Sequence, residues 1–139
     1  MATINAYLTF NGKCREAMRF YQECLGGELQ LQTIGESPMS GCMPATMKEH
    51  ILHAVLVKGE LILMGSDMVS DEGIRKGNTV SLALNLNTEA EIRSCYKKLS
   101  AGGKANHPLE DTFWGALFGD LTDKYGNHWI LNFTKSSAV

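Results

Sequence analysis

The feature that most constrains the fold is a pattern that occurs twice along the 139-residue chain. Each half predicts a strand, a helix that ends at a Gly-Gly pair, a second strand and then a pair of strands. The helices end at Gly26-Gly27 in the first half and at Gly102-Gly103 in the second. Each such unit leaves one face of its sheet uncovered, so two units can curve around a shared cavity with their helices outside. We therefore expect an α+β fold of two βαβββ modules, with a curved mixed sheet around a cavity.

Apolar periodicity locates the elements of each module. Alternation at every second residue predicts strands, and apolar spacing of three and four residues predicts helices. Thr88 and Glu91 have the spacing of a capping box at the start of the second helix. In the first half we expect strands at 4–10, 28–34, 51–57 and 60–65 and a helix at 14–25, and in the second half strands at 79–86, 104–107, 114–121 and 127–133 around the helix that follows Thr88.

The length of the chain suits one domain over residues 1–139. We expect the first module at about 3–65, a polar linker at about 66–78 and the second module at about 79–134. Residues 35–49 predict a long loop that contains three methionines, and methionine adapts to varied apolar shapes. This loop would act as a lid over the cavity or as a dimer contact.

The composition excludes several classes of protein. Hydrophobic residues make up 44% and charged residues 20%, as in an ordinary globular core. The 13 Lys and Arg residues against 15 Asp and Glu residues give no basic surface, so we expect no nucleic-acid partner. Apolar runs are far shorter than the roughly 20 residues of a membrane span, and the first residues lack a signal-peptide pattern. The chain has four irregularly spaced cysteines, Cys14, Cys24, Cys42 and Cys95. This spacing indicates reduced thiols, so we expect a cytoplasmic location.

Short motifs spread along nearly the whole chain carry a family resemblance. They are Tyr7-Leu8-Thr9-Phe10-Asn11-Gly12, Ala17 with Phe20-Tyr21, His53-Ala54, Thr112-Phe113-Trp114-Gly115, Phe118-Gly119, Thr122-Asp123-Lys124-Tyr125-Gly126 and Trp129. This set resembles the PhnB-like family of the vicinal-oxygen-chelate superfamily, which includes glyoxalases, ring-opening dioxygenases and bleomycin- and fosfomycin-resistance proteins. The resemblance implies a glyoxalase-like fold and a homodimer. Some members carry a label for ubiquinone-pathway methylation, but no glycine-rich loop after a strand offers a site for S-adenosylmethionine.

The resemblance also indicates where a metal would bind. In metal-dependent members, His and Glu side chains on the first and last strands of each module hold a divalent ion that polarises vicinal oxygens. Here these positions hold Tyr7 on the first strand and, on the others, Ile62 and Met64, Ser81, Ala83 and Asn85, and Ile130 with His128 and Asn132. One imidazole together with hydroxyl, amide and alkyl groups is a poor ligand set for zinc, nickel or manganese. We therefore expect no metal site and no cofactor.

The candidate ligand-binding residues are the polar side chains that the strand patterns place on the inward faces, the histidine that the resemblance indicates, His53, and two rings of an aromatic cluster that would line an apolar cavity, Trp114 and Phe118. A packed core would prefer aliphatic residues there, because a buried polar atom costs free energy unless it is paired. The set is Tyr7, Thr9, His53, Ser81, Asn85, Trp114, Phe118 and Asn132. The aromatic rings are equally consistent with core packing, and His53 with a structural histidine.

Four further titratable side chains remain open to interpretation. Asp120 lies in mid-strand, where it would face solvent or pair inside the cavity, with His53 as one partner. We expect His50, which precedes a strand, and His107, which precedes Pro108, to lie at the surface. His128 lies near the start of the last predicted strand. No catalytic residue is assigned.

Three functions fit these residues. The leading one is a cytoplasmic, homodimeric protein that binds a small molecule in its cavity without a conventional metal site. The competing one is a lyase, isomerase or dioxygenase that uses a divalent ion held by His53, His128 and water, or a metal-free acid–base reaction at His53 and Tyr7. The third is an interaction module whose apparent cavity is filled by side chains.

Overall fold

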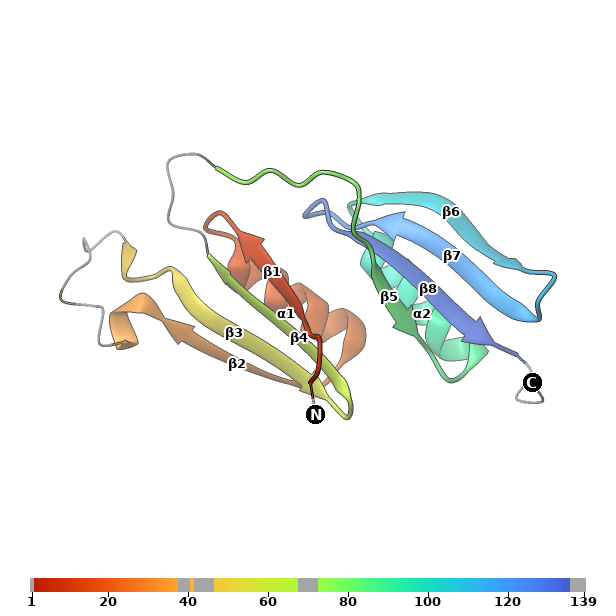
Figure 1. Ribbon diagram of the computed structural model, residues 1–139, viewed down its shortest axis with the longest axis horizontal. Coiled ribbons are helices and arrows are strands. Elements are labelled where there is room, and N and C mark those ends of the chain that lie inside the picture. Colours follow the sequence, from red (N-terminus) through yellow and green to blue (C-terminus); the bar gives the residue numbers. More distant parts are fainter. Residues whose placement is uncertain (1, 38–40, 42–46, 68–72, 136–139) are drawn as a thin grey trace. The chain divides into compact units, whose positions relative to one another are not determined.

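The computed structural model describes residues 2–37, 41, 47–67 and 73–135. The chain divides into two compact units, Met1–Arg75 and Lys76–Val139, and each is described by itself. In each unit one α-helix accompanies one four-stranded sheet (Figure 1). None of the helices in the described part of the chain has the length and hydropathy that a membrane span requires.

The first unit has the predicted strand, helix and three-strand order. Its sheet has the strand order β1-β4-β3-β2, in which β1 and β4 are parallel and the other pairs are antiparallel. Of the predicted 35–49 loop, residues 38–40 and 42–46 lie outside the described residues, and so does Cys42. The elements are β1 (Ala6–Phe10), α1 (Cys14–Leu25), β2 (Glu28–Thr33), the 3₁₀ helix η1 (Ile34–Glu36), β3 (Ile51–Lys58) and β4 (Leu61–Asp67).

The second unit repeats this topology. Its sheet has the order β5-β8-β7-β6, with β5 and β8 parallel and the other pairs antiparallel. The elements are β5 (Leu82–Asn85), α2 (Glu89–Ser100), β6 (Lys104–Asp111), β7 (Ala116–Thr122) and β8 (His128–Thr134). The predicted α+β fold of two βαβββ modules is therefore confirmed.

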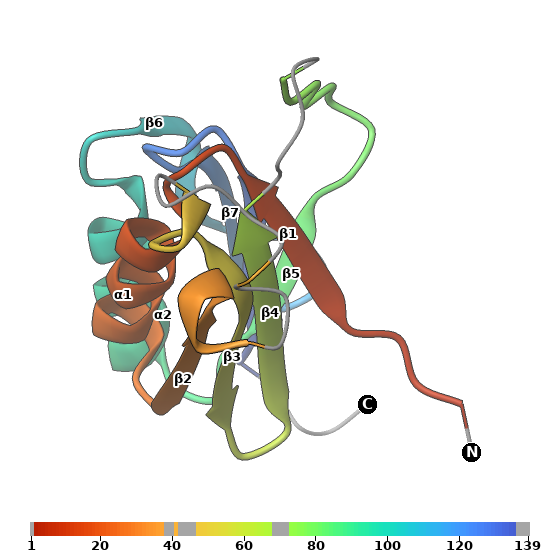
Figure 2. The same ribbon diagram turned by 90° about the vertical axis from the view of Figure 1, so that its left-hand side faces the viewer.

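Helix α1 covers one face of the first sheet (Figure 2). Its apolar residues recur every three or four positions, so they form one stripe that packs on the sheet. The buried members of the stripe are Cys14, Ala17, Met18, Tyr21, Cys24 and Leu25. Alternate residues of the strands, including Leu56 and Leu63, are buried beneath the helix.

Both ends of α1 are tied to the sheet by side chains. The Asp67 carboxylate, at the end of β4, accepts hydrogen bonds of 2.9 Å from the Cys14 N–H and 2.8 Å from the Ile51 N–H. It thereby satisfies a donor in the first turn of a helix whose own N-cap makes no side-chain bond. At the other end the Lys58 ammonium donates to the Leu25 carbonyl over 2.9 Å.

Helix α2 covers one face of the second sheet in the same way. Its buried residues are Ile92, Cys95, Tyr96 and Leu99. The predicted capping box is half formed, because the Thr88 hydroxyl accepts from the Glu91 N–H over 3.1 Å. The Glu91 carboxylate accepts from the Asn87 N–H, one residue earlier than the box requires.

All four strands of the second unit differ from the predicted bounds, and β5 and β6 differ most. Strand β5 covers Leu82–Asn85 and not 79–86, and the Val80 side chain before it is 72% exposed. Strand β6 continues through Pro108 to Asp111, beyond the predicted end at residue 107. Proline cannot donate to a sheet ladder, but β6 is an edge strand, where a missing donor is tolerated.

Candidate functional site

The second sheet presents a face without a helix, on which side chains from β5, β8 and β7 stand in rows. Alternation along the strands places the odd-numbered residues of β5 and the even-numbered residues of β7 and β8 on this helix-free face. One row is Ala83, Ile130 and Asp120, and the next row along the strands is Asn85, Asn132 and Phe118. The predicted inward positions of β5 and of the last strand therefore share one face.

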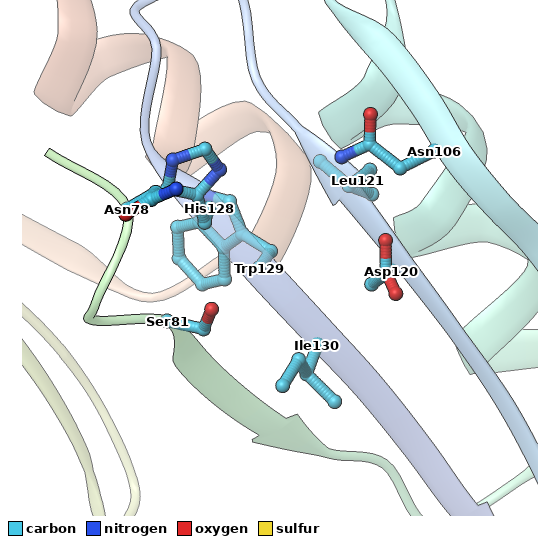
Figure 3. Close-up of a pocket in the computed structure, with 8 residues that line it drawn as sticks. All are labelled: Asn78, Ser81, Asn106, Asp120, Leu121, His128, Trp129 and Ile130. Atoms are coloured by element: carbon cyan, nitrogen blue, oxygen red, sulfur yellow. The ribbon is translucent and has the colours of Figure 1, made fainter.

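A pocket with a volume of about 210 Å³ lies at the end of this face where β8 begins (Figure 3). All of its lining residues belong to the second unit, and most carry a polar side chain. They are Asn78, Ser81, Asn106, Asp120, Leu121, His128, Trp129 and Ile130. Figure 3 shows Asn106 on the same side of the pocket as Asp120. The pocket thus brings amide, hydroxyl, imidazole and carboxylate groups together.

His128 belongs to a short chain of hydrogen bonds. Its Nδ1 atom lies 3.0 Å from the Thr122 hydroxyl, which also accepts a 2.9 Å bond from the Asn106 amide. These contacts hold the imidazole ring in place, with Nδ1 hydrogen-bonded to the Thr122 hydroxyl. Its second nitrogen has no hydrogen bond to the described residues and is available to a ligand.

Asp120 is held by the neighbouring edge strand. The His107 Nδ1 atom lies 2.9 Å from Asp120 Oδ2, and the Asp120 side chain is only 30% exposed. On the opposite face the Tyr96 hydroxyl of α2 lies 2.8 Å from the His107 carbonyl and 2.9 Å from the Asp120 carbonyl. Burial, and then the Asp120 charge, raises the pKa of Tyr96, so the phenol keeps its proton. The helix therefore fixes the backbone of both members of the His107–Asp120 pair.

The local shape of β6 makes this pair possible. Its pairing with β7 shifts register on both sides of His107, which is the mark of β-bulges. A Cβ atom on Gly119 would lie 3.0 Å from the His107 carbonyl oxygen and 3.1 Å from the Leu109 nitrogen. Gly119 therefore allows the bulged strand to approach β7 closely. Asp120, for which the sequence left several partners open, pairs with His107.

The predicted site residues of the second unit separate into three places. Ser81 lines the pocket. Asn132 donates a 3.3 Å bond to Asn85, so these two amides pair along the helix-free face, outside the pocket lining. Trp114 and Phe118 stack edge to face with ring centroids 6.1 Å apart, and Trp114 is 54% exposed.

Trp129, one of the family motif residues, has a structural role. Its side chain is only 3% exposed, and its indole N–H donates a 2.8 Å bond to the buried Asp123 carboxylate. Trp129 alternates with His128 and Ile130 along β8, so its ring lies on the helix-covered face. It is a core residue that borders the pocket.

The predicted site residues of the first unit also share a helix-free face. The Tyr7 and His53 rings have centroids 6.1 Å apart, with 32° between their planes. Tyr7 is 49% exposed, and Thr9 follows it on the same side of β1. The eight predicted residues thus fall into two groups, three in this unit and five in the other.

The residues at the superfamily's metal positions do not fit a divalent ion. They offer one imidazole, that of His128, and otherwise a phenol, a thioether, a hydroxyl, amides and alkyl chains, which make a poor ligand set for such an ion: Tyr7, Ile62, Met64, Ser81, Ala83, Asn85, Ile130 and Asn132. Across residues 2–37, 41, 47–67 and 73–135, no group of three His, Cys, Asp or Glu side chains is placed to hold a metal.

Sequence reasoning missed three polar contributors to the pocket. Asn78 lay in the predicted linker, Asn106 lay in the predicted strand at 104–107, and Thr122 was named only as part of a family motif, with no role in a site. Asn106 precedes His107-Pro108, and a proline inside a strand pattern is the signal that indicates an irregular edge strand here.

Comparisons with known proteins identify the family of this chain and several similar proteins. The sequence profile of the glyoxalase/bleomycin resistance protein/dioxygenase superfamily matches residues 3–131. The chain is 34% identical to the protein YjdN of Escherichia coli, with 98% of each chain covered. Its sequence is 38% identical to that of protein PA1353 from Pseudomonas aeruginosa. The crystal structure of PA1353 matches this fold with a TM-score of 0.86, and the match covers 98% of this chain and 100% of that one.

A further solved structure is relevant to the resemblance to the PhnB-like family. It is a PhnB protein from Bacillus cereus, named a putative 3-demethylubiquinone-9 3-methyltransferase, with 28% identity, a TM-score of 0.72 and coverage of 95% of this chain and 99% of that one. The PhnB-like resemblance is therefore confirmed, and the chain belongs to the glyoxalase/bleomycin resistance protein/dioxygenase superfamily.

Proposed function

We propose that this protein binds a small molecule in the pocket of its second unit, without a conventional metal site. The observation that carries the proposal is the lining of that pocket, where Ser81, Asp120 and His128 meet on one sheet face. Binding sites usually combine a concave surface with a few convergent polar groups. A surface that existed only to support the fold would have no need of three different hydrogen-bonding chemistries in one hollow.

The size of the pocket sets the scale of the ligand. Its volume of about 210 Å³ is below the range of about 300–1,000 Å³ that is typical of drug-sized ligands. We therefore infer a compact metabolite and not a large aromatic drug. Ile130 supplies an apolar wall, and the amides of Asn78 and Asn106 supply donors and acceptors around it.

The alternative that uses a divalent ion does not have comparable support. A divalent-metal lyase, isomerase or dioxygenase needs several carboxylate and imidazole ligands, and at the superfamily positions His128 is the one such side chain. The methyltransferase name of the Bacillus cereus relative also finds no support, because the sequence has no glycine-rich loop after a strand that would hold S-adenosylmethionine.

We also propose that the protein is a cytoplasmic homodimer. The family resemblance supports a dimer, and so do the aromatic side chains exposed at the turn after β6, where Phe113 is 97% and Trp114 54% exposed. Cys14 is a buried free cysteine, which supports a reducing compartment. Analytical ultracentrifugation tests the dimer, and a monomer at every concentration would reject it.

A thermal-shift panel of amines, sugars, amino acids, carboxylates and phosphates tests the binding proposal. We expect at least one compound class to raise the melting temperature of protein treated with a chelator, because a ligand that binds only the folded state stabilises it. No response to any class, with and without added zinc, nickel, manganese or iron, would contradict the proposal.

Two matched variants locate the response. His128→Gln changes the imidazole that lines the pocket, and His53→Gln changes the imidazole of the first unit. We expect the first substitution to weaken the response and the second to leave most of it. The reverse result would move the ligand to the first sheet and contradict the assignment of the pocket.

A further inference from the structure

The pocket has an asymmetric charge. Of its eight lining residues Asp120 is the acidic one, and none is Lys or Arg. His107 engages Asp120 Oδ2 at 2.9 Å. The other carboxylate oxygen, Oδ1, accepts no hydrogen bond from the described residues. An oxygen of a partly buried carboxylate is therefore left for a ligand.

This carboxylate is held by more contacts than a surface acid needs. His107 fixes one oxygen, the Tyr96 hydroxyl lies within 2.9 Å of both backbone carbonyls, and Gly119 lets the bulged strand approach. Groups held in this way lose little freedom when they bind, which strengthens binding without new contacts. The arrangement is that of a preorganised anionic anchor.

We propose, on the basis of the function proposed above, that the pocket recognises a small polyol that carries a protonated amine. The amine donates to Asp120 Oδ1, and His107 acts as a positioning residue that holds Oδ2. The hydroxyl groups meet Ser81, the second nitrogen of His128 and the amides of Asn78 and Asn106. Each of these groups can exchange hydrogen bonds with a hydroxyl.

The chemistry of the carboxylate selects the amine. An ionised carboxylate only accepts hydrogen bonds, so a ligand must bring a donor to Oδ1. A charged donor makes a bond roughly twice as strong as a neutral one. A carboxylate or phosphate on the ligand would instead meet Asp120 as a like charge, with no Lys or Arg among the lining residues to offset it.

Three compounds on one carbon skeleton isolate the charge: glucamine, sorbitol and gluconate, which are cationic, neutral and anionic at neutral pH. Amide NMR titrations of the full-length protein follow the signals of Ser81, Leu121 and Ile130. We expect glucamine to shift them saturably and sorbitol to bind about ten-fold more weakly, the scale of one charged hydrogen bond. Gluconate should leave these signals unshifted.

Variants test the two members of the pair separately. Asp120→Asn keeps the shape and removes the charge, so it should abolish the preference for glucamine over sorbitol. His107→Ala should weaken glucamine binding, and His107→Asn should restore much of it, because an asparagine amide places a donor near the Nδ1 position. Asp111→Asn is the control, since it removes an equal charge from β6 at a side chain that pairs with Lys135 outside the pocket lining.

The outcomes separate this inference from the function on which it rests. Equal binding of glucamine and sorbitol, preference for gluconate, or an unchanged preference in Asp120→Asn would each overturn the amine assignment. If other panel compounds shift the pocket signals and glucamine does not, the inference fails and small-molecule binding stands. If no compound of any class shifts them, the proposed function fails as well.

Discussion

The indole N–H of Trp129 donates a 2.8 Å hydrogen bond to Oδ2 of Asp123, and both side chains are almost completely buried. Oδ1 of the same carboxylate accepts from the backbone N–H groups of Tyr125 and Asn127, at 2.8 and 3.1 Å. One carboxylate thus closes the turn between β7 and β8 and fixes the start of β8. Because His128 lies at that start, the turn also positions one wall of the pocket.

Asp123→Ala should therefore destabilise the protein strongly. It leaves three buried or half-buried donors without their acceptor, and we expect a loss of about 3 kcal/mol in the free energy of unfolding. Urea denaturation followed by circular dichroism measures it. Trp129→Phe removes one of these donors and keeps the apolar ring, so its cost should be smaller. A loss below about 0.5 kcal/mol for Asp123→Ala would contradict this account of the turn.

Asp67 should act as a distant cap for α1. Asp67→Ala removes the acceptor of the Cys14 and Ile51 N–H groups, and the cost of a lost cap is about 1–2 kcal/mol. Asp67→Asn keeps one acceptor oxygen and turns an amide donor toward the other N–H, so it should recover only part of this. Equal unfolding free energies for Asp67→Ala and the wild type would show that solvent replaces the cap.

Cys14 should be inert in the native protein. Burial, and then the Asp67 charge, raises the pKa of its thiol to about 12. At pH 8 about one molecule in ten thousand then carries the thiolate, which is the reactive form. Iodoacetamide followed by mass spectrometry should label Cys14 in denaturant and leave it unlabelled without denaturant. Rapid labelling of Cys14 under native conditions would contradict the buried position.

Tyr96 should stabilise the folded state at neutral pH and lose this contribution at alkaline pH. Its pKa is raised from the usual value of 10.0, so the folded state favours the protonated phenol. The contribution is complete below the unfolded-state pKa and is lost as pH rises through the folded-state pKa. The difference in unfolding free energy between the wild type and Tyr96→Phe should therefore be largest near neutral pH. A difference that is constant up to a pH of about 11 would contradict the raised pKa.

The sequence was sufficient to predict the helices and the topology. Helix α1 has the predicted bounds, because its apolar stripe is regular and Gly26-Gly27 ends it. A Cβ on Gly27 would lie 2.5 Å from the Val57 carbonyl oxygen, and Gly27 adopts a φ of 98°, so this position requires glycine. Strand alternation also assigned Ser81 and Asn132 to the correct face.

The sequence was not sufficient to predict the His107–Asp120 pair. Register between strands depends on bulges, and one extra residue changes which side chains stand opposite each other. The shifts around His107 leave no regular trace in the apolar pattern of β6, whose side chains are nearly all exposed. For the same reason Asn106 was missed, although its amide supports Thr122 beside the pocket.

The central claim is that a small molecule binds the second unit without help from a metal ion. An amide NMR map of metal-stripped protein, titrated with the panel compound that most raises the melting temperature, tests it most directly. We predict saturable shifts at Ser81, Asp120 and His128 that stay unchanged when a chelator is present. Shifts centred on Tyr7 and His53 that arise only after zinc, nickel, manganese or iron is added would contradict the claim.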